Sequence, residues 1–435
     1  MSRLLLIGCG PLPHPAARST SFAQLRAAHF QAALQADGHA LTTLLIGPPG
    51  PPTPGVEAWA EGDPALPARL ARLAEEADAV ITAGPYLPAR LAAQAPIEAP
   101  LWIDLPGDPF AELDALLRRG PLPAARLAAA LSAAHGPLRR ADALSTISQR
   151  QRLATLGELA AIGRIGEGAP EVSTLPIAAL TNWPPLPPRP VEGPLRVALS
   201  GAFNAWFDEE AAIRGLEAAL AAMPALGVIS TGGGVPGFFE EGARRWASFA
   251  ARHPRRVQHH GWVDHAAIPA LLAPARVGLC LDRAGLEPEL GSRTRALLFA
   301  HLGMALVASP RTELVAALAA DHPGAVFPVE DADPATLIEA LTAAGRSTVE
   351  ARRALQRDVA ERFAPLPLAA PLRAWARAPR RADIQSDPMG VLLAENARLR
   401  DAIAGIEGGP TWRILSRGHR ALRSLKALIS SASNP

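Results

Sequence analysis

Residues 277–308 hold the pattern that most limits how this chain can fold. A short apolar run at 277–281 is followed by a charged loop, an apolar helix that ends at Gly303, and a second apolar run from 306. Apolar runs of this length are typical of parallel strands that are buried on both faces. Two such strands joined by a helix form the βαβ unit of an α/β domain. The same alternation runs through both halves of the chain, which predicts two doubly wound parallel-sheet domains facing a cleft.

The loop and the helix start in this stretch carry residue types that bind a phosphorylated sugar. Ser292 is predicted as the N-cap of the helix, with Arg293 and Arg295 in its first turn. Backbone N–H groups at a helix N-terminus bind phosphate, and guanidinium groups strengthen that binding. Glu287 and Glu289, a few residues upstream, are strong acceptors for sugar hydroxyls. An ordinary βαβ unit with a charged surface loop has the same residue types and stays the alternative.

The N-terminal half begins with a predicted βαβ unit, with strands at 3–7 and 40–46 and a helix at 22–36. Pro13 stands where a dinucleotide-binding fingerprint needs its third glycine, which disfavours a nicotinamide enzyme.

Asp104 and Asp108 belong to the segment DLPGDP, which follows a predicted strand that begins at Leu101. Open α/β sheets bind ligands at the carboxyl ends of their strands, so both carboxylates are candidates for contact with an acceptor substrate. The alternative is that each one only stabilises a turn.

A proline-rich segment at 182–190 can be neither a helix nor a central strand, and it marks a domain boundary. We predict an N-terminal α/β domain at 1–190, a C-terminal α/β domain at 191–365, and a linker with a basic amphipathic helical tail at 366–435.

Two loops of the C-terminal domain follow predicted strands and contain glycines that allow a ligand to approach the backbone closely. One holds Gly201 and Asn204, and the other holds Gly232 and Gly233. A mobile turn is the alternative for the second loop. No Gly-Lys-Ser/Thr follows it, so it is not a P-loop.

Four stretches of the chain resemble bacterial glycosyltransferases with the GT-B fold (group 1, family 4-like). They are LDRAGLEPELGSRTRALLFAHLGMALVAS at 281–309, SGAFNAWFDEEAAIRGLEAAL at 200–220, VISTGGGVPGFFEE at 228–241 with HHGWVDHAAIPALL at 259–272, and ADALSTISQRQRLATLGEL at 141–159. They span most of residues 1–310 in the expected order.

The resemblance implies a hexosyltransferase-like enzyme that moves a sugar from a nucleotide-diphosphate-sugar donor to a glycan or glycolipid acceptor, as in polysaccharide biosynthesis. It also implies retention of anomeric configuration, no bound metal ion, and no cofactor besides the donor substrate.

The site residues that we predict fall into three groups. The catalytic candidates are Glu287 and Asp108. The donor-binding candidates are Glu289, Gly291, Ser292, Arg293, Thr294, Arg295, Arg283, Gly201, Asn204, Gly232, Gly233, Trp262 and Val263. The acceptor-side candidates are Gly10, His14 and Asp104. The resemblance places Trp262 at a strand end that frames the nucleobase and His14 beside the interdomain cleft. A core tryptophan and a solvated loop histidine are the alternatives.

One position departs from the family pattern. Family members have an acidic residue five positions before the helix-terminal glycine, where it binds the donor ribose, and this chain has Leu298 there. A non-catalytic relative that binds a sugar nucleotide or a partner protein is therefore the alternative function. A sugar-nucleotide epimerase is a second enzyme alternative, although no set of acids and histidines for it is evident.

The composition excludes several other classes. The net charge of the 435 residues is +2, which gives no electrostatic case for nucleic-acid binding. Two cysteines make neither a disulfide framework nor a metal cluster. No apolar stretch reaches the roughly 18 residues of a membrane span. We expect a cytoplasmic protein. The basic helix predicted at 412–428 leaves three readings open: contact with the inner face of the plasma membrane, packing on a partner, or a solvated end.

Overall fold

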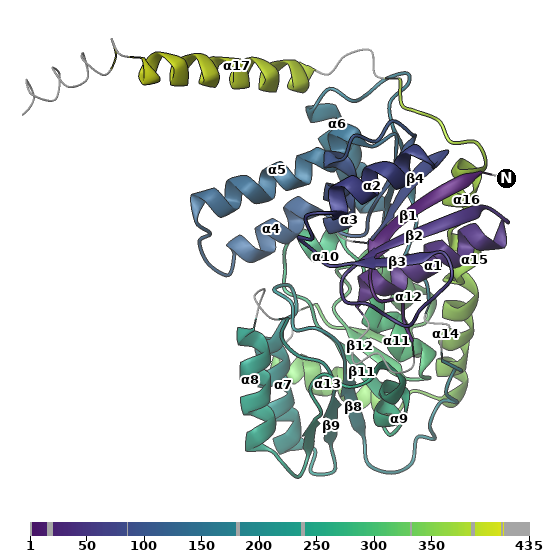
Figure 1. Cartoon of the computed structure of the whole chain (residues 1–435). Coiled ribbons are helices and arrows are strands. Elements are labelled where there is room, and N and C mark those ends of the chain that lie inside the picture. Colours follow the sequence, from purple (N-terminus) through teal and green to yellow (C-terminus); the bar gives the residue numbers. More distant parts are fainter. Residues whose placement is uncertain are drawn as a thin grey trace, which may run out of the picture.

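A computed structural model describes residues 2–14, 21–84, 86–179, 183–235, 240–330, 333–383, 388–409 and 412. In these ranges the chain forms two parallel sheets, one in each half, with helices on both faces of each sheet (Figure 1). The predicted α/β class with two doubly wound domains is confirmed. Most of the basic tail predicted at 412–428 lies outside the described residues.

The N-terminal sheet has, within the described ranges, seven strands in the order β3-β2-β1-β4-β5-β6-β7. They are β1 (Arg3–Cys9), β2 (Ala40–Ile46), β3 (Val56–Trp59), β4 (Ala79–Ala83), β5 (Leu101–Leu105), β6 (Ala143–Thr146) and β7 (Glu171–Thr174). The helices between them are α1 (Phe22–Ala36), α2 (Leu66–Glu75), α3 (Leu87–Gln94), α4 (Pro109–Leu117), α5 (Ala124–Arg140) and α6 (Gln149–Ala161).

The C-terminal sheet has six strands in its described part, in the order β10-β9-β8-β11-β12-β13. They are β8 (Arg196–Leu199), β9 (Gly227–Ser230), β10 (Val257–His259), β11 (Val277–Cys280), β12 (Ala305–Ala308) and β13 (Val326–Pro328). The helices are α7 (Glu209–Ala222), α8 (Glu241–Arg252), the 3-10 turn η1 (His265–Ala267), α9 (Ile268–Leu272), α10 (Leu286–Leu290), α11 (Thr294–His301), α12 (Glu313–Asp321), α13 (Pro334–Gly345) and α14 (Val349–Arg362).

Alternate residues of each strand enter different cores, which explains the continuous apolar runs of the sequence. In β1, Leu4 and Leu6 pack against α1, whereas Leu5 and Ile7 pack against α2, α3, α5 and α6. Successive side chains of a strand point to opposite faces, so a strand covered on both sides must be apolar throughout. The second sheet is covered in the same way, by α7, α8 and α13 on one face and by α9, α11, α12 and α14 on the other.

The connector at 183–195 is held on the C-terminal domain. Trp183 stacks on His265 with ring centroids 4.2 Å apart, and its carbonyl lies 3.0 Å from the ring Nε2 of His301. The Arg276 guanidinium donates to successive carbonyls of the connector, including 2.7 Å to that of Glu192.

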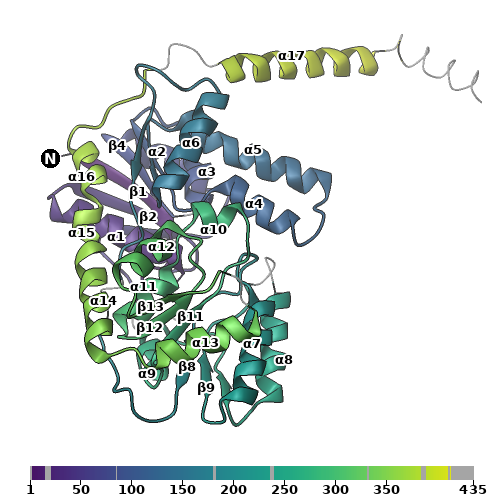
Figure 2. The ribbon, with the colours of Figure 1, turned by 180° about the vertical axis from the view of Figure 1, so that it is seen from behind.

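The chain then returns to the N-terminal domain through α15 (Pro365–Leu368) and α16 (Ala370–Arg377), which continue the column of α14 along one side of the molecule (Figure 2). Leu372, Trp375 and Ala376 of α16 join the N-terminal core, so this part of the predicted linker is an integral helix. The last described helix, α17 (Pro388–Gly408), projects from the body in both views.

Candidate functional site

Each sheet has a position where the strand order reverses, and the predicted site residues surround both positions. The reversal lies between β1 and β4 in the first sheet and between β8 and β11 in the second. Loops that leave neighbouring strands in opposite directions open a crevice there, which is where open α/β sheets bind ligands. Gly10 and His14 follow β1, Gly201 and Asn204 follow β8, and Arg283 follows β11.

The glycine loops after β8 and β9 lie against each other. Gly201 and Gly232 have φ values of +104° and +95°, which few residues with a side chain adopt. A Cβ on Gly232 would lie 2.1 Å from the carbonyl oxygen of Gly201. The N–H of Phe203 donates to the Gly233 carbonyl at 3.0 Å, which ties the two loops together. The structure therefore brings the predicted glycines into one glycine-lined surface, in which Gly201 is half-buried and Gly232 and Gly233 are buried.

Trp262 extends this surface from the end of β10. Its indole N–H donates to the carbonyl of Gly234 at 3.0 Å, and 48% of the residue stays exposed. A Cβ on Gly233 would lie 3.4 Å from the indole nitrogen, so the ring borders the glycine loop. The alternative of a core tryptophan does not hold at this exposure. Val263 follows and is half-buried.

Helix α11 begins later than the sequence predicts. Its first residue is Thr294 and its N-cap is Arg293, without a capping side chain, so Ser292 lies just before the helix. Arg295 donates to the carbonyl of Ala202 at 2.8 Å and lies over the ring of Phe207 at 5.1 Å. The guanidinium of Arg295 therefore lies beside Gly201, at the glycine surface.

Arg293 has a different environment from the exposed cation that its sequence position suggests. Its buried guanidinium forms ion pairs with Asp282 at 2.7 Å and with Glu287 at 2.6 Å. Two carboxylates surround its single positive charge, and the pair with Glu287 fixes that carboxylate in place. Gly291 packs tightly here, because a Cβ on it would lie 2.6 Å from the Glu287 carbonyl. A phosphate contact by Arg293 stays a prediction, and the geometry favours a positioning role.

A short helix, α10, replaces the loop predicted around Glu287 and forms much of the domain interface. Ser148, the N-cap of α6, donates to the Leu290 carbonyl at 2.6 Å. Glu289, which we predict to bind the sugar, is half-exposed. It pairs with Arg150 of the N-terminal domain at 2.7 Å, so it already contacts that domain.

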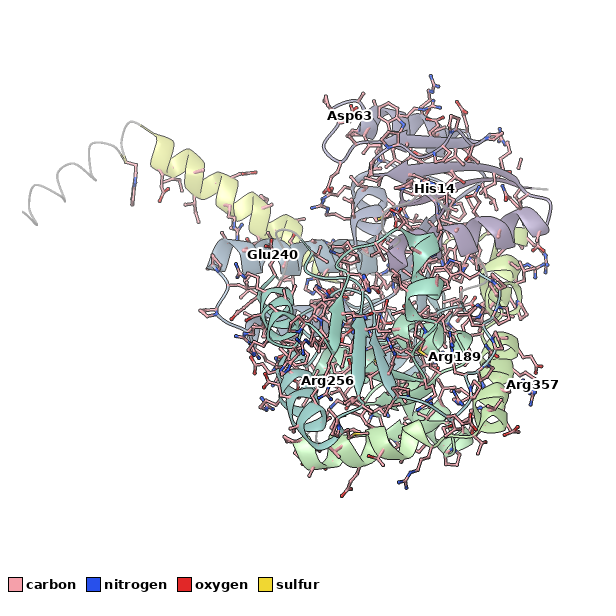
Figure 3. All side chains as sticks on the ribbon, turned by 90° about the horizontal axis from the view of Figure 1, so that it is seen from below. His14, Asp63, Arg189, Glu240, Arg256 and Arg357 are labelled. Atoms are coloured by element: carbon pink, nitrogen blue, oxygen red, sulfur yellow. The ribbon has the colours of Figure 1, made fainter. Side chains whose placement is uncertain are left out.

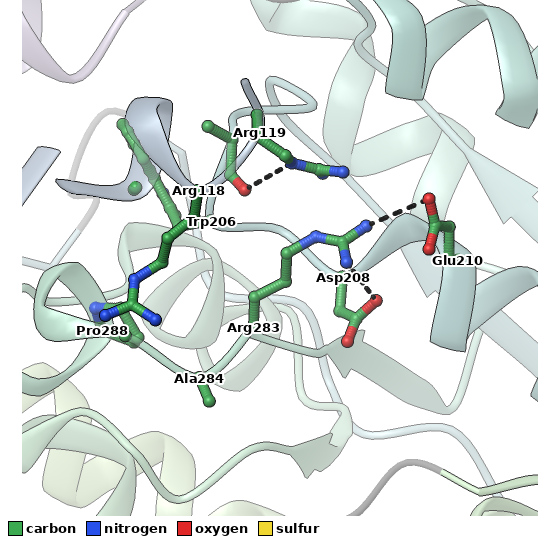
Figure 4. Close-up of a pocket in the computed structure, with 11 residues that line it drawn as sticks. Arg118, Arg119, Trp206, Asp208, Glu210, Arg283, Ala284 and Pro288 are labelled. Carbon is green, nitrogen blue, oxygen red and sulfur yellow. Dashed lines mark hydrogen bonds and ion pairs between the residues drawn. The ribbon is translucent and has the colours of Figure 1, made fainter. Parts of the chain in front are cut away.

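A pocket of about 360 Å³ opens at the domain interface beside α10 (Figure 4). Arg118 and Arg119 of the α4 end line it from the N-terminal domain. Arg283 faces them and pairs with the buried carboxylate of Glu209 at 3.0 Å. Arg119 binds the same carboxylate at 2.9 Å, so Glu209 joins the two domains. Asp208 and Glu210 also line the pocket and pair with Arg283 at 3.6 and 3.7 Å, so carboxylates offset much of its positive charge.

Glu112 is a residue of the interface that the sequence analysis missed. It lies in the first turn of α4, against the only tyrosine of the chain, Tyr86, and faces Glu287 of the other domain. Burial, and then the negative charge of Glu287, raise the pKa of Glu112 to about 8. Burial also raises the pKa of Tyr86. Glu112 is therefore mostly protonated at neutral pH and is a hydrogen-bond donor beside the predicted catalytic Glu287.

Asp108 lies one turn earlier, as the N-cap of α4, where it accepts from the N–H of Ala111 at 2.8 Å. Its carboxylate lies close to Glu158 of α6. Burial and the neighbouring Asp108 raise the pKa of Glu158 to about 8. Asp108 therefore caps a helix, in line with the alternative that it stabilises local structure, and it also lies at the edge of the domain interface.

Asp104 is fully buried, with its carboxylate bound to Arg26 at 2.8 and 3.0 Å and to Ser145 at 2.7 Å. This arrangement favours a structural role over acceptor contact. Gly10 is buried against Leu45, and its carbonyl accepts from Gln24 at 3.1 Å. His14 is half-buried in the loop that leads away from it, and within the described part no hydrogen bond or ion pair joins it to the interface residues above.

The described residues contain no group of three or more His, Cys, Asp or Glu side chains arranged to hold a metal ion. None of their helices combines the length and the apolar character needed to cross a membrane.

Comparison with known proteins identifies solved structures of the same architecture. HepE from Anabaena, in complex with UDP and glucose, is 15% identical with a TM-score of 0.60 over 87% of this chain and 100% of its own. Sucrose-phosphate synthase from Thermosynechococcus elongatus is 15% identical, with a TM-score of 0.60 over 87% and 98%. α,α-Trehalose 6-phosphate synthase from Burkholderia multivorans is 13% identical, with a TM-score of 0.57 over 87% and 99%.

No family model and no curated protein matches the sequence. The structural neighbours are GT-B glycosyltransferases, and at these identities they establish the fold. The chain therefore has the two-domain GT-B fold, with the predicted donor residues on its C-terminal sheet.

Proposed function

We propose that this protein is a glycosyltransferase that transfers a hexose from a nucleotide-diphosphate sugar to a glycan or glycolipid acceptor. The observation that carries the proposal is the convergence of loops from β8, β9, β10 and β11 at the position where the strand order of the C-terminal sheet reverses. This surface combines glycine backbone with positive φ, an exposed indole and a guanidinium. Those are the groups that a nucleobase and a diphosphate require.

The donor is proposed to lie across this surface. Trp262 would stack on or border the base, and Gly201 and Gly232 would admit the diphosphate close to the backbone. Arg295 and the N-terminal N–H groups of α11 would stabilise the charge that develops on the departing diphosphate. Glu287, held by Arg293, would accept hydrogen bonds from the sugar hydroxyls.

The reaction is proposed to break the bond between the anomeric carbon and the diphosphate oxygen, whose electron pair leaves with the diphosphate, and to form a bond from that carbon to the oxygen of an acceptor hydroxyl. The proton of that hydroxyl would pass to the departing diphosphate. Positioning and leaving-group stabilisation would supply most of the rate enhancement. We propose retention of configuration and transfer without a metal ion or a further cofactor, as the family resemblance implies. Asp108 and Glu112 are the carboxyl groups available on the acceptor side. The acceptor would be met at the cytoplasmic side of the envelope.

Calorimetric titration with UDP-, GDP- and dTDP-sugars tests the proposal, with UDP-glucose first because HepE is known in complex with it. Trp262→Ala and Arg295→Ala each remove one proposed donor contact and leave the buried Arg293 cluster intact. We expect at least about a tenfold loss of affinity in each. The matched control is Arg357→Ala, on the outer face of α14 (Figure 3). Failure of all donors to bind would refute the proposal.

The alternative function is a non-catalytic relative that binds a sugar nucleotide or a partner protein. The observation that favours it is Leu298, which is 6% exposed and packs in the core of the C-terminal domain in place of the family's acidic residue. Release of nucleoside diphosphate from a bound donor separates the two functions. Binding without release, with a broad set of glycan and glycolipid acceptors present, would favour the alternative. Isomerisation of the free donor would instead indicate an epimerase.

A further inference from the structure

The helix α17 exposes an apolar stripe that none of the described residues covers. Leu392, Leu399, Ile403 and Ile406 are 50–65% exposed, although these are residue types that a soluble protein usually buries. The helix has 21 residues, which corresponds to about 31 Å and three heptads. A helix this long is stable in water mainly when such a stripe packs against a partner.

The spacing of the stripe is that of a coiled coil. Leu392, Asn396, Leu399, Ile403 and Ile406 follow one another at intervals of four, three, four and three residues. This places Asn396 and Ile403 at a positions and the other three at d positions of a heptad. Isoleucine at a and leucine at d favour two strands, and a single asparagine at a favours a parallel dimer in one register.

The charges beside the stripe fit the same partner. Glu395 occupies a g position and Arg400 the e position of the following heptad. In a parallel dimer the g residue of one helix lies next to the following e residue of the other, so the two copies would form two Glu395–Arg400 pairs related by symmetry. Within one copy, Glu395 pairs with Arg398, which lies at position c, away from the stripe.

We propose that α17 pairs with α17 of a second copy of this chain in a parallel, in-register two-stranded coiled coil. A lipid surface fits the helix less well. Its charged residues are Glu395, Arg398, Arg400, Asp401 and Glu407, which give no positive excess for anionic headgroups, and Asn396 interrupts the apolar face. This proposal does not depend on the proposed enzymatic activity.

Sedimentation equilibrium of the full-length chain over a wide concentration range tests the pairing. We expect a reversible monomer–dimer equilibrium that Leu399→Lys weakens at least tenfold, because it places a charge at a central d position. The matched control is Val391→Lys, which also charges an exposed apolar residue but lies at position c, and we expect no change. A monomer at every concentration, or equal weakening by both variants, would overturn the proposal.

Charge reversal tests which residues face each other. Arg400→Glu should weaken the dimer, because the new carboxylate of one copy would lie beside Glu395 of the other, and adding Glu395→Arg should restore it. Arg398→Glu, which changes a charge at position c, is the control and should leave the dimer in place. Absence of restoration in the double variant would contradict the parallel register.

A cysteine placed at one end of the stripe tests orientation. In a parallel dimer, Ile406→Cys brings two thiols together and should give a disulfide-linked dimer on mild oxidation, whereas Ala404→Cys at position b should not. Cross-linking of both or of neither would exclude a parallel coiled coil. Binding of the wild-type chain, but not the Leu399→Lys chain, to phosphatidylglycerol vesicles without self-association would show that lipid is the partner instead.

Discussion

At the residue scale, the backbone of the proposed donor surface depends on two glycines in contact. Gly232 has both a positive φ and a neighbour that leaves no space, since an added Cβ would lie 2.1 Å from the Gly201 carbonyl. Strain and steric overlap are separate costs, and an alanine at this position would carry both.

Gly232→Ala is therefore expected to lower the free energy of unfolding by at least about 2 kcal/mol and to weaken donor binding by moving the loop. Chemical denaturation and calorimetric titration measure the two effects. Gly62→Ala is the control, because Gly62 has φ +84° but no atom within 4 Å of its added Cβ. It should lose only about 1 kcal/mol and bind donor normally. Equal losses in both variants would mean that the contact with Gly201 contributes nothing.

At the element scale, α16 is the clearest case of a segment whose role depends on a distant partner. It follows the C-terminal domain in the chain, but Trp375 packs on Trp102 of β5 with ring centroids 5.5 Å apart. Asp37, at the end of α1, pairs with both Arg373 and Arg377 of the same helix. The two domains are therefore connected twice, through the connector before β8 and through α16.

Trp375→Ala is expected to destabilise the protein by about 3 kcal/mol or more, because it opens a cavity in the N-terminal core. It should also expose the segment after α14 to limited proteolysis. Leu366→Ala on α15 is the control, since Leu366 is 42% exposed, and its effect should stay within about 0.5 kcal/mol. Unchanged proteolysis of the Trp375 variant would show that α16 does not need this anchor.

At the scale of the whole molecule, the two domains bring acidic groups together across their interface. Glu112 of α4 faces Glu287 of α10, and the pKa of Glu112 is raised from 4.5 to about 8 by burial and by that charge. A carboxyl whose pKa is higher in the folded state than in the unfolded chain binds its proton more tightly when folded. Its contribution to stability is complete below about pH 4.5 and falls as the pH rises to about 8.

Glu112→Gln keeps the hydrogen-bonding shape without the charge, so it should flatten this fall and make the variant more stable than the wild type above about pH 8, by about 1–3 kcal/mol. Denaturant unfolding at several pH values between about 5 and 9 measures the difference. Glu158, with a pKa also near 8, should retain part of the slope. The control is the exposed Glu98→Gln, which should follow the wild type. If Glu112→Gln has the same pH dependence as the wild type, the Glu112 carboxyl is exposed to water in the folded protein.

Much of the fold could be predicted because its signals are local. The helix at 22–36 and the strand at 40–46 have the predicted bounds. Ser21 caps this helix with its own side chain, a signal within four residues of the helix start. Apolar runs likewise reveal a strand that is covered on both faces, whichever helices cover it.

Which side chain meets which was decided only by the tertiary structure. The sequence identifies Arg293 as a cation near a helix start, but its buried partners Asp282 and Glu287 become visible only when α10 forms. Likewise, Glu112, Tyr86 and Glu287 are far apart in the chain and meet only because the two sheets face each other. Secondary structure follows from neighbours along the chain, whereas the charge state and partners of a site residue follow from desolvation and contacts between distant segments.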